Sequence, residues 1–255
     1  MYAEERQQAI ADLLSLRGRL SVTELAAEYD VTTETVRRDL SLLERAGIVR
    51  RVHGGAVPAE ALTVLEARVD DRDRARSAEK ERIARAALDL LPRTGGSLLL
   101  DAGTTTARLA AMLPRDVSLT VITNAVPIAA RLAGMSNVEL LLLPGRVRAT
   151  TLAAVGESTV EALRTVRTDV AFLGSNGLSE THGFSTPDPS EAAAKRAMVA
   201  AAQKVVVLLD SSKMGRENTV RFAEVSDVDV VVTDSGIAER DLLWLKDQDV
   251  EVVVA

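Results

Sequence analysis

Seven short, nearly continuous apolar runs in the C-terminal part of this chain limit the folds that it can adopt. The runs occupy residues 97–101, 119–122, 138–143, 169–173, 204–209, 229–233 and 250–254. A strand that is apolar at successive positions is buried on both faces, as in a parallel sheet covered by helices, whereas a strand with one exposed face alternates. Segments with helical spacing separate several of the runs, at 105–113, 126–132, 190–202 and 239–245. The pattern therefore predicts an open, mostly parallel α/β domain.

Three zones of the chain differ in pattern. Residues 1–57 are typical of short helices that end in a glycine pair, and residues 77–255 hold the α/β pattern. Between them, residues 58–76 contain a dense run of mixed charge and are expected to be a linker. Ser77 is expected to cap the first helix of the α/β domain, and Pro92 to end it. We therefore expect a small N-terminal domain and a larger C-terminal one.

The composition excludes several classes of function. The chain of 255 residues has no cysteine and two histidines, so we expect neither disulfides nor a metal site built on thiolates or histidines. Aromatic residues make up 2% of the chain, which argues against binding dominated by stacking. The N-terminus has no apolar signal-peptide core, and no run approaches the roughly 18 apolar residues of a membrane-spanning helix. We expect a cytoplasmic protein without a cofactor, a metal or a membrane partner.

The N-terminal zone predicts three short helices. The first is expected over 4–16. Residues 21–24 (Ser-Val-Thr-Glu) form a capping box at the start of the second, and Thr32 can cap a third over 33–46. Two helices joined by a short turn after a preceding helix form a helix-turn-helix, whose second helix enters the major groove of DNA. Asp39, inside the third helix, is expected to pair with an arginine rather than to contact a base.

A positive charge excess is confined to the end of this zone. The whole chain has a net charge of −6, yet residues 37–51 contain five arginines against two acidic residues. Such an excess favours binding to DNA phosphates through counterion release.

Residues 48–56 are expected to form two short strands that turn at the glycines and make up a wing. By itself, the three-helix pattern suits a protein-binding module equally well. The candidate DNA contacts are Thr33, Glu34, Thr35, Arg37, Arg38, Arg50, Arg51 and His53.

Polar segments follow five of the expected strands. The segment 101–106 (Asp-Ala-Gly-Thr-Thr-Thr) opens a helix and offers free amides to an anion. The others are 123–124, 144–148, 174–177 and 210–213. Because parallel strands end at one edge of the sheet, where ligands of such folds bind, we expect one polar pocket there. Arg148 and Lys213 suit a phosphate, and the amides and hydroxyls suit a polyol, although each residue taken singly is better explained as part of a surface loop.

Both zones resemble the DeoR family of bacterial transcriptional regulators. In the N-terminal zone the resemblance is carried by Thr-Val-Arg-Arg-Asp-Leu at 35–40 and Arg-Arg-Val-His-Gly-Gly-Ala at 50–56. In the C-terminal zone it is carried by DAGTTT, TNA, LPGRVR, DVAFLGSNGLSETHGFSTPD, EAAAKRAM and VVVLLDSSKMG. The resemblance implies a winged helix-turn-helix followed by a domain similar to the fold of ribose-5-phosphate isomerase and CoA transferase. One departure is Gly145-Arg146, where many relatives have paired glycines.

The resemblance also implies a function. It points to a DNA-binding transcriptional regulator, expected to be a repressor of a sugar-metabolism operon, with double-stranded operator DNA and a phosphorylated sugar as its partners. It implies a homo-oligomer, a dimer or tetramer, that leaves the DNA when the sugar binds. The effector-binding residues that it points to are Asp101, Gly103, Thr104, Thr105, Thr106, Thr123, Asn124, Arg148, Asn176, Gly183, Lys195 and Lys213.

A sugar-phosphate isomerase-like enzyme is the alternative. Isomerisation needs a carboxylate base beside the substrate carbon and an acid or cation at the carbonyl. Isomerases of this fold are rich in acidic residues at the turn corresponding to 174–177, where this chain has none. Glu191 and Lys195 are either remnants of such a site or a solvated pair on a helix. We therefore assign no catalytic residue and expect a regulator rather than an enzyme or a purely structural oligomer.

Overall fold

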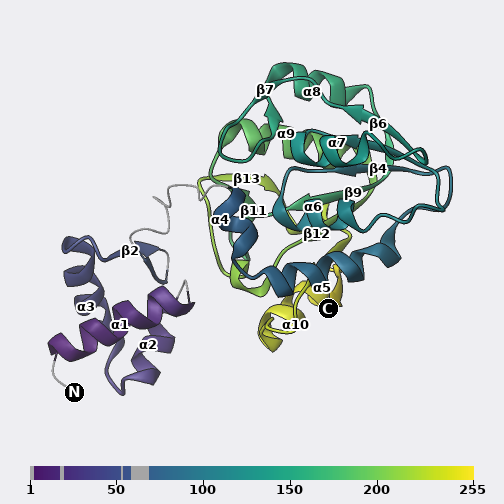
Figure 1. The fold of residues 1–255 in the computed structure, drawn as a ribbon. Coiled ribbons are helices and arrows are strands. Elements are labelled where there is room, and N and C mark those ends of the chain that lie inside the picture. Colours follow the sequence, from purple (N-terminus) through teal and green to yellow (C-terminus); the bar gives the residue numbers. More distant parts are fainter. Residues whose placement is uncertain (1–2, 18–19, 53, 59–68) are drawn as a thin grey trace. The chain divides into compact units, whose positions relative to one another are not determined.

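The computed structural model describes residues 3–17, 20–52, 54–58 and 69–255 (Figure 1). The chain forms two compact units, Met1–Leu65 and Glu66–Ala255. Among the described residues, no helix is both long enough and apolar enough to span a lipid bilayer.

Helices and a small antiparallel sheet make up the described part of the first unit. The helices are α1 (Ala3–Arg17), α2 (Val22–Glu28) and α3 (Thr33–Arg45), and the strands are β1 (Leu20–Ser21), β2 (Val49–Val52) and β3 (Gly55–Pro58). The strand order is β1-β3-β2. The centre of this unit is formed by fully buried aliphatic side chains, among them Ile10, Leu14, Leu25, Val36 and Leu40. The predicted helix-turn-helix, with β2 and β3 as its wing, is confirmed.

The capping signals in the sequence explain where α2 and α3 begin. Ser21 accepts a hydrogen bond from the Glu24 amide (3.0 Å), and Glu24 accepts one from the Ser21 amide (2.8 Å), so the predicted capping box forms. Thr32 accepts a hydrogen bond from the amide of Thr35 (3.2 Å), as predicted. Each of these bonds satisfies an amide that the first turn of a helix otherwise leaves without a partner.

Parallel strands form the main sheet of the second unit. They are β4 (Ser97–Leu100), β5 (Leu119–Thr123), β6 (Val138–Leu142), β9 (Thr168–Gly174), β12 (Ala202–Leu208), β14 (Val230–Thr233) and β15 (Glu251–Val254). Their order across the sheet is β15-β14-β12-β9-β4-β5-β6, and every neighbouring pair is parallel. Each apolar run in the sequence is therefore a strand of one sheet, as predicted.

Helices cover both faces of this sheet (Figure 1). One face carries α5 (Ser77–Ala87), α6 (Thr104–Ala111) and α7 (Val126–Leu132). The other carries α8 (Glu157–Arg164), α9 (Pro189–Ala201) and α10 (Glu239–Asp247). Along β4, Leu98 and Leu100 belong to the first core and Leu99 to the second. Successive side chains of a strand point to opposite faces, so an unbroken leucine run is what a doubly covered strand requires.

Several elements of the second unit have no clear signal in the sequence pattern. An antiparallel sheet has the order β10-β11-β13, and β7 pairs with β8 in a short hairpin. The bounds are β7 (Arg146–Val147), β8 (Ala154–Val155), β10 (Gly177–Ser179), β11 (Gly183–Thr186) and β13 (Val220–Ala223), with 3-10 turns η2 (Leu88–Leu90), η3 (Ser211–Lys213) and η4 (Val225–Asp227). Strands of two to four residues are too short to establish an apolar period, and β10 and β11 also contain glycine and serine.

Two expectations about the start of the second unit differ from the structure. Ser77 is not a cap but the first residue of α5, because the cap position is held by Arg76 in a left-handed conformation, with φ 51° and no side-chain cap hydrogen bond. The linker expected over 58–76 ends earlier, since Val69–Arg74 form helix α4. The Val69 amide donates a hydrogen bond to the Thr150 carbonyl (3.0 Å), so α4 belongs to the second unit.

The expectation that every strand is buried on both faces is wrong for the two outermost strands, β6 and β15. Leu141 and Leu142 of β6 are 43% and 52% exposed, and Val254 of β15 is 47% exposed. These strands lie at the two ends of the sheet order, so a neighbouring strand covers each of them on one side only.

A buried ion pair joins α1 to α3 in the first unit. Asp39 accepts hydrogen bonds from Arg6 Nε (2.7 Å) and Gln7 Nε2 (2.9 Å). Both charged side chains are buried. The expected pairing of Asp39 with an arginine is confirmed, and the pair fixes α3 against α1 because neither charge is stable in the interior alone.

Asp39→Ala is expected to lower the free energy of unfolding of the first unit by about 3 kcal/mol, because Arg6 would stay buried without a counter-charge. Glu34→Ala is the matched control, since it breaks an exposed pair with Arg37 in the same helix, and its cost should stay below about 1 kcal/mol. Urea unfolding of the full chain, followed by circular dichroism, measures both. Equal losses for the two variants would contradict the structural role of Asp39.

Candidate functional site

Helix α3 presents polar side chains away from its buried residues. Its apolar side is formed by Val36, Leu40 and Leu43, which are buried in the core of the first unit. Of the candidate DNA contacts on α3, Thr35 is half-buried and the others are exposed, namely Thr33, Glu34, Arg37 and Arg38. Within the first unit, this part of α3 is therefore left accessible to a macromolecular partner.

Arg51 of β2 links the wing to α3. Its guanidinium donates a hydrogen bond to Ser41 Oγ (3.1 Å), and its amide donates one to Glu44 Oε1 (2.9 Å). The arginine of the wing and the exposed side of α3 thus belong to one surface. His53 lies outside the described residues, as does the side chain of Arg50.

The strand order of the larger sheet reverses between β4 and β9. From β4 the chain continues to β5 and β6 on one side and then returns to β9 on the other. In open α/β sheets, ligands bind at the carboxyl ends of the strands at such a point, because the connections diverge and leave a crevice. Asp101 follows β4 and Gly174 ends β9, so these two residues mark the place where a ligand is expected.

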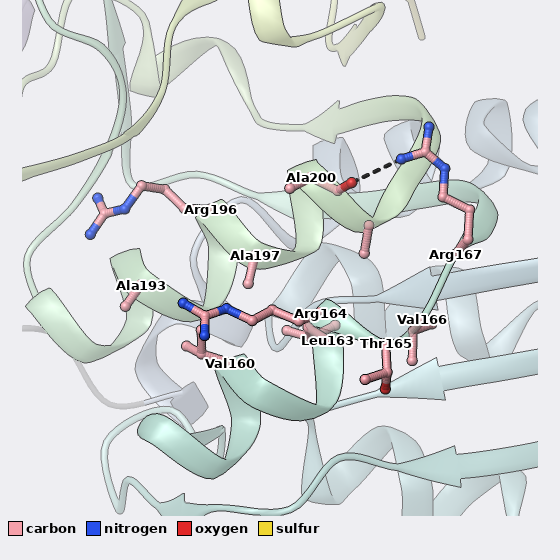
Figure 2. A pocket seen from close by; sticks show the side chains of 11 residues that line it. Val160, Leu163, Arg164, Thr165, Val166, Arg167, Ala193, Arg196, Ala197 and Ala200 are labelled. Carbon is pink, nitrogen blue, oxygen red and sulfur yellow. Dashed lines mark hydrogen bonds between the residues drawn. The ribbon is translucent and has the colours of Figure 1, made fainter.

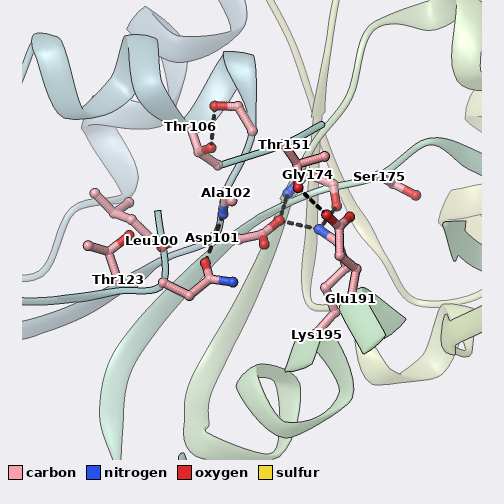
Figure 3. A network of polar contacts seen from close by, with 12 residues as sticks. Leu100, Asp101, Ala102, Thr106, Thr123, Thr151, Gly174, Ser175, Glu191 and Lys195 are labelled. Atoms are coloured by element: carbon pink, nitrogen blue, oxygen red, sulfur yellow. Dashed lines mark hydrogen bonds and ion pairs between the residues drawn. The ribbon is translucent and has the colours of Figure 1, made fainter. Parts of the chain in front are cut away.

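Lys195 of α9 joins these two strand ends (Figure 3). Its Nζ donates hydrogen bonds to Asp101 Oδ2 and to the Gly174 carbonyl (2.9 Å for the latter), and the Gly174 amide donates to the same Asp101 oxygen (3.0 Å). Burial raises the pKa of the Asp101 carboxyl, and the Lys195 ammonium and the Gly174 amide oppose that rise. Glu191 and Lys195 are only 6% and 4% exposed, so they are not a solvated helix pair.

Arg148 is held by carboxylates of α9. Its Nη2 lies 3.2 Å from Asp188 Oδ2 and its Nη1 lies 2.5 Å from Glu191 Oε1, to which Thr151 also donates a hydrogen bond. Asp188 caps α9, because its carboxylate accepts hydrogen bonds from two amides of the first turn (2.9 Å each). Together with Asp101 and Lys195, these side chains form a polar cluster with three acidic groups and two cations. In the part of the chain that the structure describes, no group of three carboxylates or histidines is placed to hold a metal ion.

Thr123 and Asn124 fix the backbone around Asp101. Thr123 Oγ1 donates a hydrogen bond to the Leu100 carbonyl (2.6 Å). Asn124 Oδ1 accepts one from the Ala102 amide (3.1 Å), and its Nδ2 donates one to the Ala154 carbonyl (3.0 Å). Both side chains are buried. They position the turn after β4 against the end of β5, which is the place where the sequence predicts a binding site.

The start of α6 offers backbone amides to an anion. Gly103 occupies the cap position, and no side chain caps the helix. Thr104 and Thr105 are buried, and the Thr106 hydroxyl donates a hydrogen bond to the Gly103 carbonyl (3.0 Å). An N-terminus without a capping side chain combines free N–H groups with the positive end of the helix dipole. The segment 101–106 thus has the local structure that an anion-binding turn requires.

Lys213 lies in a cationic environment after β12. Burial lowers its pKa to about 8; Asp210 opposes the shift, and Arg216, Arg72 and Lys80 add to it. Within the described residues, its ammonium makes no hydrogen bond or ion pair. Lys213 therefore differs from Arg148 and Lys195, whose charges are balanced by neighbouring carboxylates.

Asn176 and Gly183 are placed near the antiparallel sheet. The Asn176 amide donates a hydrogen bond to the Ser185 carbonyl (3.1 Å). Gly183 has φ +63°, and a Cβ there would lie 2.5 Å from the Ala223 carbonyl oxygen, so the backbone alone explains why the residue is glycine. No hydrogen bond among the described residues joins either position to the cluster around Asp101.

Two members of the polar cluster, Asp188 and Thr151, were not predicted from the sequence. The signal for Asp188 is present in Asp-Pro-Ser-Glu at 188–191, which has a capping acid, a proline at the first helical position and a glutamate at the third. Thr151 has no such signal, because it comes from the irregular loop between β7 and β8.

A groove of about 720 Å³ between α8 and α9 is a separate feature (Figure 2). It is lined by Val160, Leu163, Arg164, Thr165, Val166, Arg167, Ala193, Arg196, Ala197, Ala200 and Ala201. None of the predicted effector residues lines it, because it lies on the side of α9 opposite Glu191 and Lys195.

Lys195→Met is expected to lower the free energy of unfolding by about 3 kcal/mol, because Asp101 would be buried without its counter-charge. Adding Asp101→Asn should restore part of the loss, since a neutral amide needs no cation, so the two effects should be strongly non-additive. Urea unfolding of the wild type, both single variants and the double variant measures this coupling. Additive effects would show that the two side chains do not depend on each other.

Comparisons with known proteins cover both units. The model of the DeoR-like helix-turn-helix domain matches residues 6–61, and that of the DeoR C-terminal sensor domain matches residues 75–235. The glycerol-3-phosphate regulon repressor of Escherichia coli (strain K12) is 31% identical over 236 residues, covering 92% of each chain. The HTH-type transcriptional repressor GlcR of Bacillus subtilis (strain 168) is 33% identical over 234 residues, covering 92% of this chain and 89% of that protein.

The HTH-type transcriptional regulator GlpR of Haloferax volcanii is 35% identical over 234 residues, covering 92% of this chain and 91% of that protein. Among solved structures, ribose 5-phosphate isomerase A from Methanocaldococcus jannaschii is similar with a TM-score of 0.41 and 18% identity, covering 55% of each chain. On the two domain matches and these full-length relatives, the chain belongs to the DeoR family of transcriptional regulators.

Proposed function

We propose that this protein is a repressor that binds operator DNA through its first unit and leaves it when a phosphorylated sugar binds the second. The observation that carries the proposal is a helix-turn-helix with exposed arginines beside a wing, in a chain that also has a sensor domain. Relatives named as repressors support it, one of them of the glycerol-3-phosphate regulon. Such a protein acts in the cytoplasm, on genes of sugar uptake or breakdown.

In this proposal, α3 reads bases and the wing contacts phosphates. Helix α3 would enter the major groove, and two copies would occupy half-sites whose centres lie about 34 Å apart or a multiple of that distance. The base contacts are assigned to Thr33, Glu34, Thr35, Arg37 and Arg38, and the wing contacts to Arg50, Arg51 and His53.

Arg51→Ala is expected to weaken binding to all DNA sequences alike and to reduce the slope of log affinity against log salt by about one, because one phosphate contact is lost. Fluorescence anisotropy with labelled operator DNA and a scrambled duplex between low and moderate salt measures both effects.

Two controls accompany this variant. Ser41→Ala removes the hydrogen bond that the Arg51 guanidinium donates to α3 while keeping the charge, and Arg93→Ala removes an exposed charge from the second unit. Neither should change the salt slope. An unchanged slope for Arg51→Ala itself would show that the wing does not contact phosphates.

We assign the phosphate of the effector to Lys213 and the start of α6, and the hydroxyl groups to the cluster around Asp101. Arg148, which the sequence also suggests for a phosphate, is engaged by Asp188 and Glu191, and Lys195 is engaged by Asp101. A phosphate would have to displace those carboxylates, whereas Lys213 has no ion pair to break within the described residues. Buried carboxylate and amide groups in turn suit the hydroxyls of a sugar.

Release from DNA follows if the effector binds the free and the DNA-bound conformations with different affinity. The coupling is reciprocal, so operator DNA must weaken effector binding by the same factor.

We also propose that the second unit does no chemistry on the sugar. A general base must be able to take a proton from the substrate, and the Asp101 and Glu191 carboxylates are instead held in ion pairs with Lys195 and Arg148.

Raising the pH from neutrality through the pKa of Lys213, about 8, is expected to weaken binding of a phosphorylated sugar, because the lysine loses its charge over this interval. Lys213→Met should weaken binding at neutral pH by about tenfold or more, the loss of one hydrogen bond to a charged group, and should flatten the pH dependence. Calorimetric titration with triose, pentose and hexose phosphates measures both, while the affinity for operator DNA should not change.

Two results would contradict this proposal. Release of DNA by a neutral sugar, with no response to any phosphorylated one, would remove the phosphate assignment. Conversion of a sugar phosphate to its isomer during the titration, at ordinary enzyme rates, would favour the isomerase alternative.

A further inference from the structure

Strand β6 leaves an apolar edge of the main sheet uncovered. It is the last strand in the order, beside β5 and close to α7 (Figure 1), so its outward backbone groups have no strand partner among the described residues. Leu141 and Leu142, on opposite faces of the strand, are 43% and 52% exposed. An exposed apolar edge strand is a template for pairing with another strand.

The opposite edge strand, β15, has the same arrangement of charge. It begins with one acidic residue, Glu251, and continues with three valines. On β6 the charge is likewise confined to Glu139 near the start, and the strand continues with three leucines. The two edges differ in their exposed apolar side chains, because β6 has two large ones, Leu141 and Leu142, and β15 has one, Val254 at 47%. The more apolar edge is therefore the better template for pairing with another strand.

We propose that β6 is the contact between two copies of this chain, which pair antiparallel about a two-fold axis at Leu141, so that the sheet of one copy continues into the other. The inference rests on the proposed function in one respect: helix-turn-helix proteins that bind symmetric operators do so as two-fold related copies. The choice of surface and register rests on β6 itself.

The register follows from burial and charge. Centred on Leu141, the ladder sets Leu141 against Leu141 of the other copy and Leu140 against Leu142, which covers the leucines that are now exposed. Centred on Leu140, it would set each Glu139 against a leucine inside the ladder and remove a carboxylate from water without a cation. The first register places the acid at the end of the ladder.

A second copy is the occupant that this edge fits best. In an antiparallel pair about a two-fold axis, each outward amide meets a carbonyl of the same strand in the other copy, so the edge complements itself. The ends of the edge also carry unlike charges, with Glu139 near the start of β6 and Arg146, exposed, shortly after its end. Antiparallel pairing brings the acidic end of one copy toward the basic end of the other, whereas parallel pairing would bring like charges together.

Cysteine cross-linking tests the register directly, because the chain has no cysteine of its own. In Leu141→Cys, the two sulfur-bearing side chains would lie directly opposite, with Cβ atoms about 5 Å apart, close to what a disulfide spans. Mild oxidation with copper phenanthroline, without DNA, should convert most of the protein to a covalent dimer on a non-reducing gel.

Two control variants define the geometry. Glu139→Cys should cross-link poorly, because the two positions would be about 14 Å apart along the ladder, four residues at the strand rise. Leu243→Cys, on α10, is similarly exposed at 53% but lies outside the proposed contact, and should stay uncross-linked. Efficient cross-linking of either control in place of Leu141→Cys would overturn the proposal.

A second measurement concerns the oligomer itself. Light scattering should show that the wild type is at least a dimer and that Leu141→Asp lowers its mass at least twofold, with an unchanged circular dichroism spectrum, whereas Leu243→Asp leaves the mass unchanged. A monomeric wild type, or a Leu141→Asp variant that keeps the wild-type mass, would overturn the proposal. Both readouts are made without DNA or sugar, so their failure is distinct from a failure of operator binding.

Discussion

The buried ion pair between Asp101 and Lys195 is the interaction on which the organisation of the second unit depends. It joins the ends of β4 and β9, the two strands between which the order of the sheet reverses, to the first half of α9. A carboxylate and an ammonium taken out of water are each unstable unless the other is present. The pair therefore holds together three segments that are far apart in the sequence, at the edge of the sheet where this type of fold binds ligands.

The same rule explains the rest of the polar cluster. Arg148 lies between Asp188 and Glu191, and Glu191 also accepts a hydrogen bond from Thr151. With its cations neutralised inside the protein, the cluster offers hydrogen bonds rather than net positive charge. This is why we assign the phosphate of the proposed effector to Lys213, whose lowered pKa reflects burial among other cations. The sugar end and the phosphate end of a ligand would thus meet regions of different charge.

In the first unit, internal pairing leaves the exposed side of α3 available. Asp39 is used internally by Arg6 and Gln7, which fixes α3 against α1, and the amide and guanidinium of Arg51 fix the wing against α3. The arginines that remain exposed on α3 are consequently presented on a rigid frame. A rigid frame matters for DNA binding because base contacts require side chains at defined positions in the groove.

The strands of the main sheet, the caps of α2 and α3 and the fold class could be predicted from the sequence. These features depend on residues close together in the chain: the valine and leucine runs of the main sheet, the capping box at Ser21 and Glu24, and the cap at Thr32. Which charges meet, that Lys195 is buried against Asp101, that β6 forms an exposed edge, and that Ser77 does not cap α5 became known only from the three-dimensional structure. Those outcomes depend on the order of strands in the sheet and on which helix covers which face. Apolar periodicity records that a segment is buried but not which segment buries it, so such partners are set by packing of the whole chain.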